Sequence, residues 1–423
     1  MDYSYYMKKR WFVLVVSCLI NLCAGSIYAW SVFSVPMEAH LNETYGLGLV
    51  PGGLAIVFTI ANMVGPITMI PGGKINDSLG PRWVVFIGGI IFGGGMFMCG
   101  FANSVLCLII CYSLGCGLGM GMIYGCNISN AVKFFPDKKG VVGGLTTACY
   151  GISSVIIPPI ANALNQSVGV TMSFKIFGVI FLVVICVGGL LQIKCPEEFI
   201  ENFEINSKAA GTPAETVGEK PAVKRDFPWN EMLKSPFFYL MLFMLMCGAV
   251  SGLMCISQAS GMATSKVGMT ASAAALAVSV LALFNTGGRV VAGLVSDKIG
   301  RLNTLLIALF CTIGGLVILA FAGNTPATFY PGICLIGISF GSFMGVFPAF
   351  TADQFGPKNN SVNFGIMFIG FAVAGYVGPT IMKTTLNSTG SYNLSFVLAA
   401  VLAVVGIVLL MIFKALQRKA NRN

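Results

Sequence analysis

One arginine, Arg289, lies well inside a long apolar stretch of the chain. A buried arginine at mid-membrane depth costs about 2.5–3.5 kcal/mol on insertion scales. Such an arginine is therefore rare unless it has a polar partner or a function. Elsewhere the sequence has no Asp, Glu, Lys or Arg deep inside an apolar stretch. A guanidinium group donates two parallel hydrogen bonds to a carboxylate. We therefore expect Arg289 to receive an anion. The alternative is a structural role, with backbone carbonyls or a helix dipole as its partners.

Asn285 lies one helical turn before Arg289, so both side chains fall on one face of the expected helix. An amide there can orient the guanidinium group or touch the substrate. It can equally form a hydrogen bond to a neighbouring helix, as polar residues in membrane helices often do.

Acidic residues are confined to tails, loops and segment ends, as with Glu38 and Asp353. Proton-coupled carriers usually need a titratable group along the path, so this placement weakens a proton-symport interpretation without excluding it. The single histidine, His40, falls in an expected loop. We expect no histidine-based catalytic or metal site, no cofactor and no enzymatic activity, because no acid–base or nucleophile–base cluster is visible. The 14 cysteines lie mostly in apolar runs and lack zinc-ligand spacing, so we interpret them as buried apolar residues.

The composition restricts the class of protein. Of the 423 residues 56% are hydrophobic and only 9% are charged, whereas soluble domains carry about 25% charged residues. A hydrocarbon core about 30 Å thick needs about 20 helical residues. Twelve segments meet this length, which predicts an all-α membrane protein: 11–35, 50–70, 83–102, 105–132, 140–162, 172–194, 236–258, 269–294, 302–322, 327–351, 361–382 and 392–413.

A hydrophilic stretch divides these segments into two groups of six. We expect an N-terminal half over residues 1–194, a cytoplasmic linker over 195–235 and a C-terminal half over 236–423. Residues 227–233 within the linker fit either a short amphipathic helix on the membrane surface or plain linker.

The placement of the basic residues predicts the orientation. Most of the 25 Lys and Arg residues fall in the tails and loops that are cytoplasmic if both termini are cytoplasmic. The net charge of +10 is then an orientation signal beside anionic lipid headgroups, and no nucleic-acid partner is needed to explain it. We expect a multi-pass protein of the cell membrane that works as a monomer, with the lipid bilayer and a small carboxylate as its partners.

Two loops repeat the pattern G-x-x-x-D-x-x-G. Gly73-Lys-Ile-Asn-Asp77-Ser-Leu-Gly80-Pro-Arg82 follows the second segment, and Gly293-Leu-Val-Ser-Asp297-Lys-Ile-Gly300-Arg301 follows the eighth. The aspartates are 220 residues apart, and Pro136 and Pro357, in loops after segments four and ten, are 221 apart. Two markers at one offset indicate two six-helix halves related by parallel repetition. We expect four of these residues to pair across helix ends and hold an inward gate shut: Asp77, Arg82, Asp297 and Arg301.

The duplicated loops resemble the signature of the major facilitator superfamily. Finer motifs look like its oxalate/formate antiporter group, which is related to the monocarboxylate transporters: Gly25-Ser-Ile-Tyr28-Ala-Trp30, Phe134-Phe-Pro-Asp-Lys-Lys-Gly140, Cys149-Tyr150-Gly151, Phe347-Pro348 and Asn363-Phe-Gly365. The resemblance covers essentially the whole chain.

This resemblance implies roles for several residues. The oxalate transporter of the group grips its dianion with an arginine in segment eight, matched by Arg289, and a lysine in segment eleven, whose place is taken here by Phe371. One fixed cation favours a monoanion, because a dianion would leave a carboxylate desolvated and unpaired. The resemblance places Tyr28, Tyr124 and Tyr150 on the cavity lining. We interpret Phe340, Phe368 and Phe371 as an apolar wall, for which the resemblance supports Phe371 through its family position. Packing is the alternative for each of these rings.

We therefore predict a secondary active transporter of small organic anions, of the pyruvate, lactate and formate class. It would work by alternating access, as an anion exchanger whose substrate carboxylate pairs with Arg289. The alternatives are an oxalate/formate-type dicarboxylate antiporter, a proton-coupled monocarboxylate symporter and, more remotely, a drug exporter of the same fold.

Overall fold

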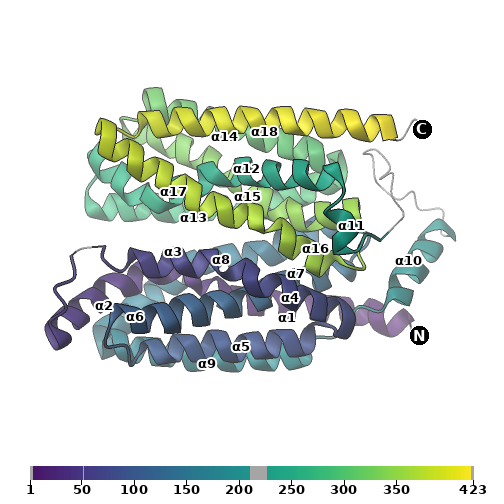
Figure 1. Cartoon of the computed structure of the whole chain (residues 1–423), viewed down its shortest axis with the longest axis horizontal. Helices are drawn as coiled ribbons and strands as arrows, with labels where there is room; N and C mark the ends of the chain where they lie inside the picture. The colour runs from purple at the N-terminus through teal and green to yellow at the C-terminus, as the bar shows by residue number, and fades with distance from the viewer. Residues whose placement is uncertain (1–2, 51, 210–225, 421–423) are drawn as a thin grey trace. The chain divides into compact units, whose positions relative to one another are not determined.

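The computed structural model describes residues 3–50, 52–209 and 226–420, and within them every regular element is a helix (Figure 1). They form two compact units, residues 1–134 with 149–200 and residues 135–148 with 201–423. The predicted all-α membrane fold is confirmed, since twelve described segments are long and apolar enough to cross a membrane. The compact units differ from the predicted boundaries at residues 135–148, and the division into functional halves stays a prediction.

The first unit holds most of the chain up to residue 200. Its helices are α1 (Tyr3–Ala24), η1 (Gly25–Ala29), α2 (Trp30–Tyr45), α3 (Ala55–Met63), α4 (Gly65–Leu79), α5 (Pro81–Cys99), α6 (Val105–Leu108), η2 (Ile109–Cys116), α7 (Gly117–Lys133) and α9 (Val170–Leu191). Two helices divide between the units, α8 (Lys139–Val168) after residue 148 and α10 (Glu197–Ala209) after residue 200.

The second unit holds the remaining helices. They are α11 (Trp229–Met232), α12 (Pro236–Gly261), η3 (Met262–Lys266), α13 (Ala271–Ile299), α14 (Arg301–Val317), η4 (Ile318–Ala322), α15 (Pro326–Phe355), α16 (Asn360–Met367), α17 (Ile369–Thr389) and α18 (Asn393–Ala420).

Several helices are longer than the apolar segments that predicted them. The first predicted segment, 11–35, belongs to a continuous helical run from Tyr3 to Tyr45. The prediction that His40 lies in a loop is therefore wrong, because α2 contains it and its Nδ1 lies 3.4 Å from the Thr44 hydroxyl. Hydropathy marks the part of a helix that suits the membrane, whereas the polar turns beyond it can also be helical.

Close helix packing in the first unit depends on glycine. α5 lies along α9, and a Cβ atom at Gly93 of α5 would lie 2.6 Å from the backbone nitrogen of Leu182. A Cβ atom at Gly178 of α9 would lie 2.5 Å from the Cα of Phe97. Any side chain at these positions would force the two helices apart, which is the role that small residues have at membrane helix interfaces.

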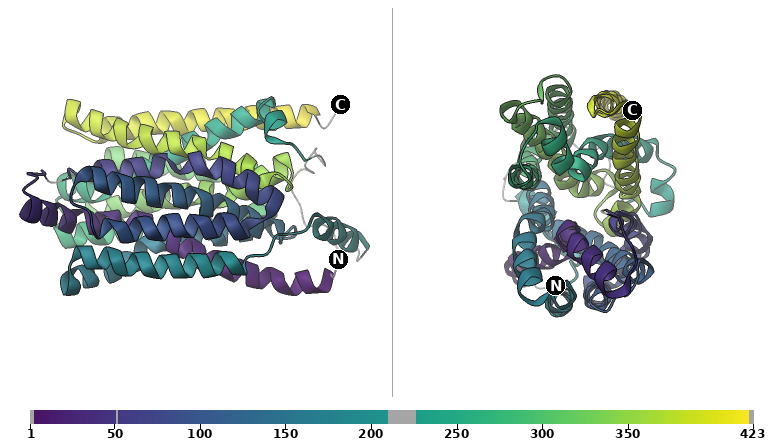
Figure 2. Two further views of the ribbon diagram at one scale, coloured as in Figure 1. Left: turned by 60° about the horizontal axis from the view of Figure 1, so that its bottom comes forward. Right: turned by 90° about the vertical axis from the view of Figure 1, so that its left-hand side faces the viewer.

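In the second unit, α13 packs along α15, while α12 packs on α17 and α18 and α14 packs on α15 and α18 (Figure 1, Figure 2). An apolar core fills the space between several of these helices, with Met254, Leu316, Phe329, Ile333 and Phe396 fully buried. This packing holds α13, which carries Arg289, against α15.

The end of the predicted linker is attached to the second unit. The backbone nitrogen of Phe227 donates to the carbonyl of Phe355 at 2.8 Å, and its carbonyl accepts from the Asn359 and Asn363 amides at 3.2 and 3.0 Å. The helix predicted as one alternative near 227–233 is the single turn α11, whose Met232 is fully buried. Residues 210–225 of the predicted linker lie outside the described residues.

Candidate functional site

Arg289 is among the largest fully buried side chains of the described residues, with 1% of its surface exposed. Its Nε donates to the Asn285 amide oxygen at 3.3 Å, and its Nη1 donates to the backbone carbonyl of Thr147 in α8 at 2.8 Å. Both acceptors are neutral. Within the described residues no carboxylate forms an ion pair with Arg289. Two of its N–H groups donate hydrogen bonds, but no negatively charged group among the described residues neutralises its charge.

Glycines let neighbouring helices reach the backbone of α13 at the level of Arg289. A Cβ atom at Gly345 of α15 would lie 2.5 Å from the Arg289 carbonyl oxygen, and one at Gly144 of α8 would meet the same atom. Gly341 of α15 faces the Asn285 carbonyl in the same way. The arginine is thus held on a helix whose backbone is enclosed by α8 and α15, which restricts how far the backbone of Arg289 can shift.

The three predicted wall residues form one column of stacked rings. The Phe368 and Phe371 ring centroids are 4.5 Å apart with planes at 23°, and those of Phe371 and Phe340 are 6.3 Å apart at 26°. All three side chains are buried. Phe340 precedes Gly341 on α15, so the column begins beside the residue that faces Asn285. This arrangement can present an apolar surface, and it contains no cation.

The three predicted tyrosines come together in the first unit. Tyr150 of α8 packs edge-on against Tyr28 at 5.3 Å and against Tyr124 at 4.7 Å. Gly25 makes this possible, because a Cβ atom there would collide with the Tyr150 carbonyl. Ser26 follows Gly25 in the chain, and Ser153 lies three residues after Tyr150. The hydroxyls of both serines are buried and have no hydrogen-bond partner among the described residues. The cluster is rich in hydroxyl groups, although its contact with substrate stays a prediction.

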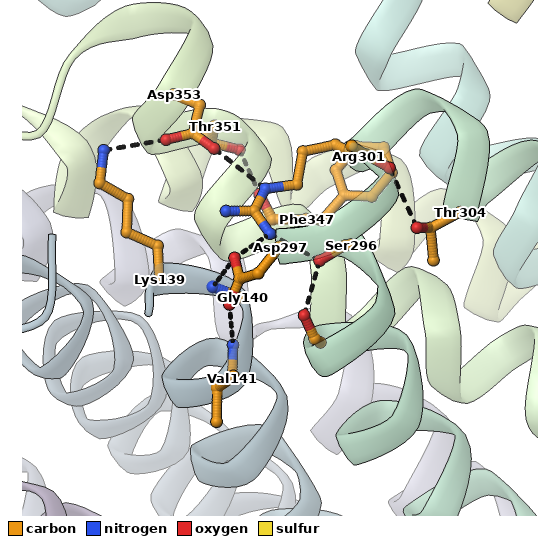
Figure 3. A network of polar contacts seen from close by, with 12 residues as sticks. Lys139, Gly140, Val141, Ser296, Asp297, Arg301, Thr304, Phe347, Thr351 and Asp353 are labelled. Carbon is orange, nitrogen blue, oxygen red and sulfur yellow. Dashed lines mark hydrogen bonds and ion pairs between the residues drawn. The ribbon is translucent and has the colours of Figure 1, made fainter. Parts of the chain in front are cut away.

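Asp297 binds the start of α8. Its two carboxylate oxygens accept from the backbone nitrogens of Gly140 and Val141, each at 2.9 Å (Figure 3). The first N–H groups of a helix have no partners within the helix and carry a partial positive charge, so a carboxylate stabilises them. Asp297 therefore joins the end of α13 to the first turn of α8.

Arg301 extends this contact into a network. It donates to Asp297 at 2.6 Å and to Asp353 at 3.0 Å, and Lys139 donates to the other oxygen of Asp353 at 2.9 Å (Figure 3). These four side chains are between 13% and 25% exposed, so solvent screens them only in part. Two of the predicted gating residues, Asp297 and Arg301, are thus paired directly.

A family model for the Major Facilitator Superfamily matches residues 16–379 and, in a second match, residues 253–423. The chain belongs to the Major Facilitator Superfamily. The fold agrees, because the structure of the E. coli fucose:proton symporter FucP superimposes with a TM-score of 0.69 at 14% identity, covering 95% of this chain and 98% of that one.

Relatives within the superfamily support the predicted group. The uncharacterized MFS-type transporter YhjX of Escherichia coli (strain K12) is 28% identical, covering 88% of this chain and 87% of the relative. The oxalate:formate antiporter of Oxalobacter formigenes is 27% identical, covering 93% and 89%. Human monocarboxylate transporter 12 is 21% identical, covering 96% and 81%. The predicted resemblance to the oxalate/formate antiporter group is confirmed.

The other copy of the superfamily loop is built differently. Asp77 accepts from Lys133 of α7 at 2.7 Å, whereas Arg82 is exposed and forms no ion pair among the described residues. With the two aspartates aligned, Pro81 stands where the second copy has Arg301, and Arg82 is displaced by one position. The expected pairing of Arg82 is therefore not seen, because the second residue of α5 points to the surface. The gating role of all four residues stays a prediction.

The prediction missed four polar partners, namely Thr147, Lys133, Lys139 and Asp353. Lys133 and Asp353 carry a signal that was available, since they are 220 residues apart, like the two aspartates of this superfamily motif. Thr147 contributes a backbone carbonyl, which every residue has. No pattern of side chains could have found it.

Proposed function

We propose that this Major Facilitator Superfamily protein carries small monocarboxylates, of the pyruvate, lactate and formate class, by alternating access. The observation that carries the proposal is the state of Arg289, which is 1% exposed and has only neutral hydrogen-bond acceptors among the described residues. A buried ionisable group in a membrane-spanning helix of a transporter family is a functional candidate. A carboxylate would supply the missing negative charge.

The preference for one negative charge rests on position 371. The phenyl ring of Phe371 stacks between two other rings, and no ammonium group stands there to bind a second carboxylate. Stripping water from an unpaired carboxylate costs several kcal/mol. A methyl or hydrogen substituent of a monocarboxylate has no such cost beside a ring. The same reasoning makes a dicarboxylate the weaker ligand.

Exchange is the proposed mode of transport. Asn285 and Thr147 bind the guanidinium group of the empty carrier, but neither neutralises it. An uncompensated charge in low dielectric disfavours the rearrangement that would return an empty carrier. A bound carboxylate on the return step removes that cost, so each outward substrate would be exchanged for an inward one.

Two alternative transport functions remain to be compared with the proposed one. The similarity to an oxalate:formate antiporter supports dicarboxylate exchange as the first alternative, whereas the similarity to monocarboxylate transporter 12 supports a monocarboxylate as substrate. Proton-coupled symport of a monocarboxylate is the second alternative. No enzymatic step is part of the proposal, and both alternatives share the same anion site at Arg289.

Counterflow in proteoliposomes distinguishes these functions. Vesicles loaded with unlabelled pyruvate, lactate, formate or oxalate would be diluted into labelled pyruvate at equal pH on both sides. We expect transient accumulation of label with the three monocarboxylates and little with oxalate. Accumulation with oxalate alone would favour the dicarboxylate function. Uptake that appears only when a pH gradient is imposed on the same vesicles would favour symport. No accumulation with any of the four would contradict the proposal.

A further inference from the structure

The first turns of α8 lie against α13 along a seam that we define by Gly140, Val141, Gly144 and Thr147 of α8 and Arg289, Gly293 and Asp297 of α13. The two helices are antiparallel here, because the earliest α8 residues meet Asp297 and the latest meets Arg289. Polar contacts close both ends of the seam.

Glycines fill the middle of the seam. A Cβ atom at Gly293 would lie 3.2 Å from the Cα of Gly144 and would collide with the carbonyl of Gly140. A Cβ atom at Gly144 would meet the Arg289 carbonyl. The backbones therefore touch over the whole distance between Asp297 and Arg289, and α8 cannot shift at one end of the seam without disturbing the other.

The hydrogen bonds of Arg289 leave one edge of its guanidinium group open. The group has five N–H donors. The single Nε–H is used by Asn285, and one hydrogen of Nη1 is used by the Thr147 carbonyl. The described residues give Nη2 no hydrogen-bond partner. The second Nη1 hydrogen and the Nη2 group therefore provide the two parallel donors that a carboxylate accepts.

We propose that the Thr147 carbonyl is a positioning group for Arg289, so that the affinity of the site for a carboxylate is coupled to the docking of α8 on α13. With α8 docked, Asn285 and Thr147 fix the guanidinium plane and direct its open edge to the ligand. With α8 displaced, one of the two constraints on that plane is lost. This inference rests on the proposed function and adds the element that controls its site.

Coupling of this kind acts in both directions. If docked α8 raises the affinity for a carboxylate, then the bound carboxylate stabilises docked α8 by the same free energy. The seam ends in the bonds from Gly140 and Val141 to Asp297, at the end of α13 that is predicted to face the cytoplasm. Substrate at Arg289 would therefore strengthen the contact at Asp297, one seam length away.

A pair of matched glycine variants tests the coupling. Gly293→Ala places a methyl group in the seam without touching the guanidinium group, whereas Gly287→Ala adds the same group on the same helix where nothing lies within 4 Å. Saturation binding of labelled pyruvate to the purified protein should weaken at least about fivefold in Gly293→Ala, a change within the usual range of allosteric coupling. Gly287→Ala should change it by less than about twofold. Equal affinities in both variants would overturn the inference.

Hydrogen–deuterium exchange on the wild-type protein gives a second measurement that does not depend on a variant folding. Saturating pyruvate should slow exchange of the Gly140 and Val141 amides severalfold, and should leave them unchanged in Arg289→Gln. Unchanged or faster exchange in the wild type with pyruvate bound would overturn the coupling alone. A wild-type protein with no saturable pyruvate binding would defeat the proposed function, and the inference with it.

Discussion

Lys133 and Asp353 stand at equivalent positions of the two repeats, 220 residues apart, and carry opposite charges. In the first repeat Lys133 binds Asp77 directly, whereas in the second Arg301 bridges Asp353 and Asp297. The first repeat has Pro81 where the second has the bridging arginine. Without that arginine an acid at position 133 would place a second carboxylate beside Asp77, and the two negative charges would repel each other. The position is therefore basic in the repeat that lacks the arginine, as Lys133, and acidic in the repeat that has it, as Asp353.

The Asp77–Lys133 pair should contribute measurably to stability. Its side chains are only 8% and 10% exposed, so solvent screens the pair weakly. A double-mutant cycle with Asp77→Asn and Lys133→Met should give an interaction free energy of about 1–2 kcal/mol, within the range found for residues in direct contact. The measurement is the free energy of unfolding in mixed micelles.

Lys74 supplies the control for that cycle, since it lies on the same helix as Asp77 and is exposed. Pairing Asp77→Asn with Lys74→Met should give additive changes, within about 0.3–0.5 kcal/mol. Additivity in the Lys133 cycle as well would show that the ion pair contributes nothing to stability.

Arg289→Gln should lower the exchange rate of labelled pyruvate by roughly 100-fold or more. The variant loses charge-assisted hydrogen bonds worth about 1.5–3 kcal/mol each. Glutamine keeps one donor for the Thr147 carbonyl, so we expect the thermal unfolding temperature to change little. Arg289→Lys should recover part of the rate, because an ammonium group restores the charge but not the two parallel donors. A Gln variant that exchanges pyruvate at the wild-type rate would exclude Arg289 as the substrate site.

Phe371→Lys should shift selectivity toward dicarboxylates. The new ammonium group can pair with a second carboxylate, which Phe371 leaves without a cation. The measurement is inhibition of labelled pyruvate uptake by oxalate, compared with inhibition by lactate and formate. Phe371→Leu is the control, since it removes the ring without adding charge and should keep the preference for monocarboxylates. Strong inhibition of the wild-type protein by oxalate and weak inhibition by lactate and formate would contradict the proposed pocket.

Loading the far side of the membrane with substrate should accelerate transport. If the uncompensated charge of Arg289 slows the empty carrier, labelled pyruvate should enter vesicles preloaded with pyruvate at least about tenfold faster than empty vesicles, a change that corresponds to about 1.4 kcal/mol in a barrier. The two vesicle populations are compared at equal pH with an uncoupler present. Equal rates in the two populations would contradict exchange. Uptake that depends on an imposed pH gradient, measured without the uncoupler, would indicate symport instead.

The architecture was largely predictable because hydropathy reports on the membrane directly. Twelve apolar segments and two loops at one offset predict twelve spanning helices in two repeats, and both the fold and the superfamily agree. The limits of the helices were less predictable, as His40 in α2 shows, because polar residues continue a helix beyond its apolar part. The grouping of residues 135–148 with the second unit depends on long-range contacts that no local pattern contains.

Parts of the candidate site were predictable to different degrees. Arg289 was evident, because a charge in an apolar stretch is rare, and Asn285 followed from helical spacing. The Thr147 carbonyl was not, because a backbone group has no signature in a sequence. The pairing expected for Arg82 is not seen among the described residues, and a proline occupies the place that Arg301 has in the second copy of the motif. A short motif specifies residue types, whereas pairing depends on where each helix begins.

The cap on α8 also has a consequence for synthesis of the chain. Gly140 and Val141 bond to Asp297, which is 157 residues beyond Gly140. At about 5–20 residues per second, the ribosome reaches Asp297 roughly 8–30 seconds after it has made the start of α8. Throughout that interval the first turn of the helix has to be satisfied by water or lipid headgroups. The nascent chain therefore carries one membrane helix whose end is completed only when the eighth spanning segment emerges.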